Sequence, residues 1–477
     1  MVSVLRLAPI VAIALVLCLT TRAADAHVAE QAFVLLLPTD IYITAGVIVV
    51  ALTVLLTVFL PASWLTFLFR PVTLIHVGRS SRRALSAVSV VTSTLCCALT
   101  FFLITLGFLG ARDPLSNPLP LAVWALFWIS LISLQGVFGD LWRWLNPWSG
   151  PYALFRGLIG NRPLFRLPRQ IGCWPALLLL VGFTAFLLAD PAPADPARLA
   201  RLVVIYWLFI FTLVALFGRR TLQQIEFLSV LLGLYRRVAI FGGRDGSLAA
   251  SLPGWQLVLP HRTTWSIALF ATVLLGSGSF DGLNETFWWL ATIDVNPLEF
   301  PGRSAVIAET ITGLLASNLL LILVFAVTTL LGTLLAHGGR DVVRRFAQAF
   351  RLFAPALLPI ALGYHIGHYL TSFLVEIQYA LAAASDPWAT GADYLGLGTF
   401  YVTTGFFNTQ ATIEVIWLTQ AGVIVVGHVL SVLVAHAQAL QLYANHKQAL
   451  LSQLPLSVFM IAYTVFGLWL LAAPRGA

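Results

Sequence analysis

Ten long apolar runs constrain the fold of this chain more than any other feature. Crossing the ~30 Å hydrocarbon layer of a membrane takes about 20 mostly apolar residues in a helix. Only 10% of the 477 residues are charged, whereas a soluble domain carries roughly 25%. We therefore predict an all-α, polytopic bundle of about ten transmembrane helices that contacts the lipid bilayer. The runs lie near 41–60, 85–109, 119–138, 173–189, 200–217, 263–280, 305–335, 353–381, 411–437 and 454–473.

Arginine and lysine residues gather in alternate connections between these runs. One set of loops holds 20 of the 27 basic residues, and the connections on the opposite side hold 5. Because basic residues concentrate on the cytoplasmic side of a membrane protein, the first set faces inward and both mature termini face outward. This distribution also accounts for the net charge of +8 without a nucleic-acid partner. The basic loops are 70–84, 141–171, 218–262, 337–351 and 438–453.

Residues 1–26 have the pattern of a cleaved signal peptide. Arg6 precedes an apolar core, and Ala24 and Ala26 fit the cleavage rule for small residues. Residues 27–477 then form a single transmembrane helical domain. Cleavage would leave His27 as the first residue, where its amine and imidazole form a chelate for copper or zinc. The alternative is that this histidine has no such role.

The eighth apolar run contains GYHIGHYLTSFLVEIQY, with several polar residues at helical spacing. At about 100° per residue, His365, His368, Ser372 and Glu376 fall on one stripe, and Tyr369 borders it. Ionisable residues inside a spanning helix are costly and mark functional sites. This stripe is therefore a candidate intramembrane site.

The ninth run carries a second stripe of Glu414, His428 and His436. The eighth and ninth helices are consecutive, so they run antiparallel. We expect His428 to meet the two histidines of the eighth helix, with both glutamates nearer the outer face. The sequence thus predicts three imidazoles gathered inside the membrane.

Imidazoles with carboxylates suit two kinds of chemistry. They bind zinc or copper, and an open coordination position would activate water. They also build proton relays. The alternative for any single histidine is an ordinary hydrogen bond to a neighbouring helix. The candidate ligands of a divalent metal ion are His365, His368, His428, His27, His436 and Glu414.

The sixth run ends in FDGLNETFWW, which places Asp281, Asn284 and Glu285 close together. These residues either cap the helix end or form a polar cluster over the intramembrane site. We count Asp281 and Glu285, with Glu376, as candidate catalytic residues. At the other face, GDLWRWLNPW (139–148) ends the third run and is typical of a structural turn. The apolar piece 225–234 predicts a short interfacial or re-entrant helix.

An Ala-His start after the signal, with FGDLWRWLNPW, SFDGLNET and HIGHY, resembles bacterial polytopic membrane proteins labelled fenitrothion hydrolase. The resemblance implies hydrolysis of an organophosphorus triester, a small apolar substrate, to a nitrophenol and a dialkyl thiophosphate. It also implies a bacterial inner membrane, periplasmic termini, and a partner subunit or homo-oligomer. In such a hydrolase Glu376 would be either the general base or a residue that orients the groups around the metal. The chain lacks the paired HxH motif of soluble phosphotriesterases, which argues against their binuclear mechanism.

A looser similarity is to copper-resistance membrane proteins, through His27 and the intramembrane histidines. The chain has only two methionines, Met1 and Met460, although copper(I) favours such soft ligands. The alternatives to a hydrolase are therefore transport of copper, zinc or a small solute, metal loading of another protein, and a purely structural subunit.

Overall fold

The computed structural model describes residue 34 and the ranges 37–59, 61–160, 163–260, 263–337, 339, 341–443 and 445–475. The predicted signal peptide and His27 lie outside these residues. We name the two ends of the bundle inner and outer, after the orientation that the arginine distribution predicts. The outer end is the one that holds Arg475 and Glu285, whose side chains lie 3.7 Å apart.

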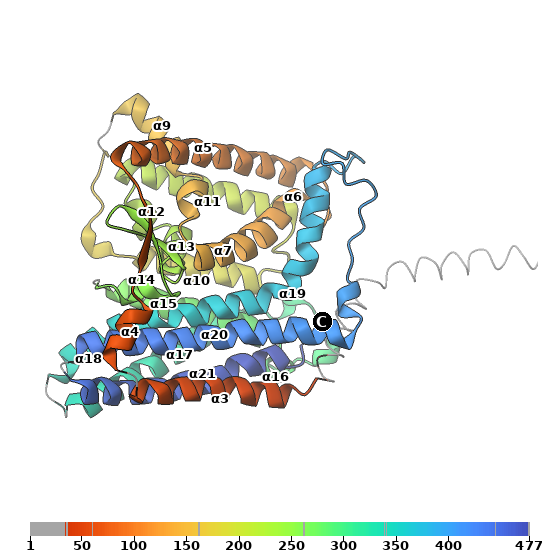
Figure 1. Ribbon diagram of the computed structural model, residues 1–477. Helices are drawn as coiled ribbons and strands as arrows, with labels where there is room; N and C mark the ends of the chain where they lie inside the picture. Colours follow the sequence, from red (N-terminus) through yellow and green to blue (C-terminus); the bar gives the residue numbers. More distant parts are fainter. Residues whose placement is uncertain are drawn as a thin grey trace, which may run out of the picture.

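Nine helical segments in the described ranges are long and apolar enough to cross a membrane, which confirms the all-α, multi-pass architecture. Figure 1 shows most of them as long rods that share one general direction. The segments are α3 (Thr39–Phe59), α5 (Arg79–Leu109), α6 to α7 (Pro118–Phe138), α11 (Pro196–Phe217), α15 (Trp265–Asn284), α17 (Ile307–His337), α18 to α19 (Val342–Ser385), α20 (Gln410–Leu442) and α21 (His446–Ala472).

The remaining predicted span is α10 (Trp174–Ala189), which has 16 residues. At 1.5 Å per residue it is about 24 Å long, less than the thickness of the hydrocarbon layer. Its two ends nevertheless follow α15. The Cys173 N–H donates to Ser266 Oγ over 2.9 Å at the start of α15, and Leu188 packs on Phe280 near its end. The short helix therefore accompanies α15 along nearly its whole length.

Helix α15 is the central helix of the bundle. In its most apolar window 78% of the residues are buried, compared with 17% in α3. The difference in burial follows from position, because helices at the periphery of the bundle expose apolar side chains to lipid. A central helix packs on protein along its whole length. Polar residues of α15 are therefore held away from the bilayer.

Short elements occupy the connections. Three strands form a small antiparallel sheet in the order β1-β3-β2, which the sequence did not predict. The strands belong to two inner connections, whose backbone N–H and C=O groups are not paired within helices. Strand pairing gives these groups hydrogen-bond partners. The strands are β1 (Val72–His76), β2 (Phe241–Arg244) and β3 (Ser247–Ala250); the short helices are α4 (Ala62–Leu68), α8 (Trp142–Leu145), α9 (Ser149–Ile159), α12 (Thr221–Gln224), α13 (Phe227–Tyr235), α14 (Trp255–Val258) and α16 (Phe287–Thr292); single 3-10 turns are Arg169–Ile171, Pro297–Glu299, Arg303–Ala305 and Gly405–Phe407.

Helix α13 contains most of the apolar piece 225–234. Most of its residues are buried, including Leu231 and Tyr235, so it packs inside the bundle. Glu226 caps its start and is 0% exposed. The carboxylate accepts hydrogen bonds from the N–H groups of Leu228 and Ser229, over 2.9 and 2.6 Å. The cap stabilises the start of α13.

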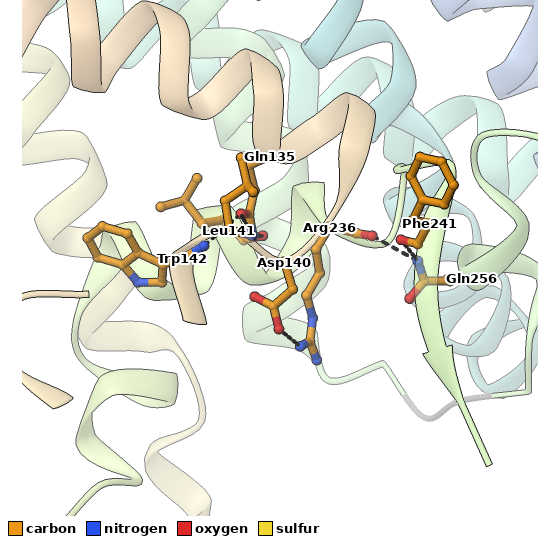
Figure 2. A network of polar contacts seen from close by, with 8 residues as sticks. Gln135, Asp140, Leu141, Trp142, Arg236, Phe241 and Gln256 are labelled. Atoms are coloured by element: carbon orange, nitrogen blue, oxygen red, sulfur yellow. Dashed lines mark hydrogen bonds and ion pairs between the residues drawn. The ribbon is translucent and has the colours of Figure 1, made fainter. Parts of the chain in front are cut away.

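The turn after α7 carries the FGDLWRWLNPW motif and is a hub of polar contacts (Figure 2). The Gln135 side-chain oxygen accepts the N–H groups of Leu141 and Trp142 over 2.7 and 2.9 Å. Asp140 pairs with Arg236 of the next inner connection over 2.8 Å. These contacts hold two inner connections together, which agrees with the structural reading of the motif.

Candidate functional site

A buried carboxylate meets a buried imidazole where α15 packs against α19 (Leu358–Ser385). Asp281 lies in the last turn of α15, and its Oδ2 is 3.3 Å from Nε2 of His368 on α19. The hydroxyl of Tyr369 donates a hydrogen bond to the same oxygen. Asp281 is 8% exposed and His368 9% exposed. We call this group the Asp281–His368–Tyr369 cluster.

His365 lies one turn before the cluster on the same face of α19. Its Nε2 is 3.0 Å from the main-chain carbonyl of Trp128. A carbonyl only accepts, so Nε2 must carry the proton in this contact. Trp128 belongs to η1 (Ala122–Leu131), a π-helical stretch between α6 (Pro118–Leu121) and α7 (Ile132–Phe138). Such stretches are uncommon and occur often at functional sites.

A small cavity borders these residues. About 40 Å³ is open to the centre of a water molecule, which is enough for roughly three waters. Three buried polar atoms in its lining have no hydrogen-bond partner among the described residues: Trp128 Nε1, Tyr364 Oη and His368 Nδ1. Because an unsatisfied buried polar atom costs about 1–3 kcal/mol, the arrangement favours water in this space. The cavity is far smaller than a drug-sized binding pocket.

Gly282 explains how α15 and α19 approach one another at the cavity. A methyl group on Gly282 would collide with the Tyr364 hydroxyl and lie 3.6 Å from His368 Nδ1. Small residues let helices in membranes pack closely. The glycine of the SFDGLNET motif is therefore needed for the helix contact that brings Asp281 to His368.

The polar residues of α20 face a different neighbour. The His428 Nδ1–H donates to the carbonyl of Ile424 over 2.9 Å, and Nε2 has no hydrogen-bond partner in the described part of the chain. The His428 ring lies 6.4 Å from the ring of Tyr463 on α21. Within the same residues neither nitrogen of His436 has a hydrogen-bond partner, although His436 is only 2% exposed.

The expected three-imidazole site is not formed. Among the described residues, no group of three or more His, Cys, Asp or Glu side chains is placed to hold a metal ion. Helices α19 and α20 do pack antiparallel, but through glycines: a methyl group on Gly363 would lie 2.5 Å from the Val423 carbonyl oxygen. Such close backbones leave no room for imidazoles between them, so the two stripes point to other helices. Metal binding itself stays a prediction.

The remaining acidic candidates are spread over the outer half of the bundle. Glu376 lies two turns beyond His368 and has no hydrogen-bond or ion-pair partner among the described residues. Glu414 accepts a hydrogen bond from the Tyr42 hydroxyl over 2.9 Å. Glu285 pairs with Arg475. None of these carboxylates reaches the Asp281–His368–Tyr369 cluster through a contact between described residues.

No protein-family model matches the chain, and no curated protein or solved structure is similar to it. Both family resemblances therefore stay predictions, and the site must be interpreted from its own geometry. Sequence reasoning missed Tyr364, whose hydroxyl borders the cavity, and Tyr463, which contacts both α15 and α20. Tyrosine spacing alone carries no signal for either role, because buried tyrosines are common in apolar cores.

Proposed function

We propose that this protein is a proton-coupled membrane transporter, in which the Asp281–His368 pair takes up and releases the proton. The single observation that carries the proposal is this buried carboxylate–imidazole contact of 3.3 Å on two central helices. Ionisable residues that pair inside a membrane are typical of proton relays. Histidine is suited to the role because its charge changes between pH 5 and 8.

The surroundings of the pair support proton transfer more than conversion of a large substrate. The cavity has room for about three waters. The Nδ1 of His368 has no partner among the residues that the structure describes, so a water there can exchange a proton with the imidazole. Tyr369 donates to the carboxylate, so Asp281 is held by a second side chain of α19 beside His368.

A second line of support is a polar connection from α15 towards α20. Ser279, two residues before Asp281, lies 2.6 Å from Tyr463 through their hydroxyl oxygens. The ring of Tyr463 is in turn 6.4 Å from that of His428. A water between the two side chains could bridge such a separation. These contacts support a polar route from α15 to the middle of α20.

From His428 towards the inner end, α20 continues with buried polar atoms. Four of these atoms lack hydrogen-bond partners among the described residues: His428 Nε2, Ser431 Oγ and both ring nitrogens of His436. The ring of His436 lies 6.0 Å from that of His446, which is exposed at the inner end. A core with so many unsatisfied groups is costly unless water reaches them. This row of buried polar atoms along α20 supports a proton route between the Asp281–His368 pair and the inner face.

The experiment measures charge movement in proteoliposomes adsorbed on a solid-supported membrane. A jump in pH should give a transient current in the wild-type protein, because protons bind within the membrane. Asp281→Asn and His368→Gln should abolish the transient while monodispersity and melting temperature are retained. An undiminished transient in Asp281→Asn contradicts the proposal.

Two matched variants control for surface charge. Asp190→Asn changes a carboxylate of the outer end, which pairs with Arg198 over 2.6 Å. His76→Gln changes an imidazole of β1, which contacts Ser247 Oγ over 2.8 Å. Both residues lie outside the helical spans, so both variants should keep the full transient.

A second candidate is the hydrolase that the motif resemblance implies. One observation favours it: two of the motifs meet, since SFDGLNET supplies Asp281 and HIGHY supplies His368 and Tyr369. A carboxylate that orients an imidazole is a general-base arrangement able to activate water. The described residues do not fit a three-ligand metal site, so no metal-dependent step is derived.

The assay for this candidate measures nitrophenol release from an aryl dialkyl phosphotriester by membranes that contain the protein. Hydrolysis above the empty-vector level that disappears in Asp281→Asn would support it. Release equal to the empty vector, with the protein present at verified amount, rejects it.

A further inference from the structure

A second cavity lies at the outer end, between the end of α15, helix α16 and the segment 297–310. Its volume is about 140 Å³, counted as space open to the centre of a water molecule. Its walls combine charge and aromatic surface, with Glu285, Arg303, Asn284, Trp289 and Phe300 among the lining residues. A concave site with a few convergent polar groups beside aromatic side chains is typical of small-molecule binding.

Arg303 gives this cavity an available positive charge. One N–H of its guanidinium donates to the Leu187 carbonyl over 3.1 Å. No acidic side chain among the described residues pairs with it, whereas the other charge of the cavity, Glu285, faces Arg475 at 3.7 Å. The guanidinium fork matches the geometry of a carboxylate, and the two-point contact is stronger than a single neutral hydrogen bond.

The outer cavity adjoins the proton site. Leu188 lines both cavities. Asn284, which lines the outer one, lies one turn after Asp281 and donates from Nδ2 to the Asp281 carbonyl over 3.3 Å. A ligand held by Arg303 would therefore lie about one helical turn from the Asp281–His368 pair, separated from it by an apolar side chain.

We infer that the outer cavity binds a small monocarboxylate, with its carboxylate on Arg303 and its short apolar part against Trp289 and Phe300. The volume is below the 300–1,000 Å³ of drug-sized pockets, which limits the ligand to a small molecule. An anion also suits a neighbouring proton site, because co-movement of one proton cancels its charge in the membrane. The transport role of the ligand rests on the proposed function, whereas its binding does not.

Butyrate is the probe, and butyramide is its neutral match in size and shape. Binding of each is measured on the purified full-length protein by isothermal titration calorimetry. Wild type should bind butyrate saturably and butyramide at least about tenfold more weakly, the loss expected for a charge-assisted contact. Equal binding of the two compounds overturns the inference. So does the absence of saturation up to about 50 mM butyrate, where a millimolar site would be filled.

Three variants assign the binding to Arg303. Arg303→Gln should weaken butyrate at least about tenfold, and Arg303→Lys should recover part of the affinity, because it keeps the charge without the fork. Arg198→Gln is the matched control, since Arg198 is an outer arginine already paired with Asp190. Wild-type affinity in Arg303→Gln, or equal losses in the Arg198 and Arg303 variants, contradicts the assignment.

Asp281→Asn separates this inference from the proposed function. Asp281 does not line the outer cavity, so the variant should still bind butyrate while its pH-jump current is lost. Normal currents without butyrate binding would reject the ligand site alone. Butyrate binding without currents in the wild type would reject the transporter alone.

Discussion

Tyr364 and His368 stack their rings one turn apart on α19, with 5.5 Å between centroids and 11° between planes. Each ring has a buried polar atom at the same cavity, and neither atom has a hydrogen-bond partner in the described ranges. Because Gly282 of α15 faces both atoms, the stack is held between the two helices that build the proposed proton site.

This packing makes Gly282→Ala a sharp test of the helix contact. The added methyl group would collide with the Tyr364 hydroxyl, and overpacking of this kind costs about 1–3 kcal/mol. Tyr364→Phe removes the colliding oxygen, so the double variant should regain part of that stability. Unfolding in mixed detergent micelles measures the stability of the wild type, the two single variants and the double variant. Strictly additive effects of the two changes would show that the helices are not in contact here.

Glu226 should be the most sensitive carboxylate for stability in the inner half. It accepts hydrogen bonds from Leu228, Ser229 and the Tyr206 hydroxyl while fully buried. Glu226→Ala leaves these donors without an acceptor and removes a helix cap, a loss of about 2–4 kcal/mol. The exposed Glu299 provides the control, and its change to alanine should alter stability by less than about 0.5 kcal/mol. Similar effects of both changes would refute the capping role.

The outer connection after α19 should loosen in acid. Hydrogen bonds from the N–H groups of Thr390 and Gly391 lower the pKa of Asp386 below its ordinary 3.8. Bonds from Gly398, Ser385 and Leu397 likewise lower the pKa of Asp393. A lowered folded pKa means that these bonds are intact above pH 3.8 and are lost as the pH falls through the folded values.

Hydrogen exchange at the Gly391 and Gly398 amides measures this loosening. After correction for intrinsic exchange rates, protection should fall as the pH drops below 3.8. The double variant Asp386→Asn with Asp393→Asn should lack that pH dependence, because amides do not titrate there. Constant protection of the wild type down to pH 2, near the acid end of ordinary carboxyl titration, would contradict the assignment.

Metal analysis of purified protein tests the separation of the two histidine stripes. His428 donates to Ile424 and neighbours Tyr463 rather than His365. His428→Ala should therefore leave any bound zinc or copper at the wild-type amount, measured by inductively coupled plasma mass spectrometry. The opposite outcome is a folded His428→Ala protein that loses a metal which both the wild type and the surface variant His76→Gln retain. That result would support a metal site shared by the two histidine stripes.

The class of the fold and the identity of the polar residues were readable from the sequence. Apolar runs of membrane-spanning length have one structural solution in a helical protein, and all ten predicted runs coincide with helices. Placing an ionisable residue inside the membrane costs free energy, so such residues in apolar runs indicate function. His365, His368 and Asp281 were candidates for this reason. The orientation of the spans and the cleaved signal stay predictions.

Only the tertiary structure decided which polar residues meet. Helical periodicity gives the face of one helix but not the neighbour that this face touches, and adjacency in sequence wrongly suggested that His428 would join His365. The close contact at Gly363 leaves no room for side chains between α19 and α20. Gly282 allows α15 to pack closely against another face of α19. Asp281 and His368 therefore form the site because the smallest residues fix which backbones approach, and this depends on all the helices packing at once.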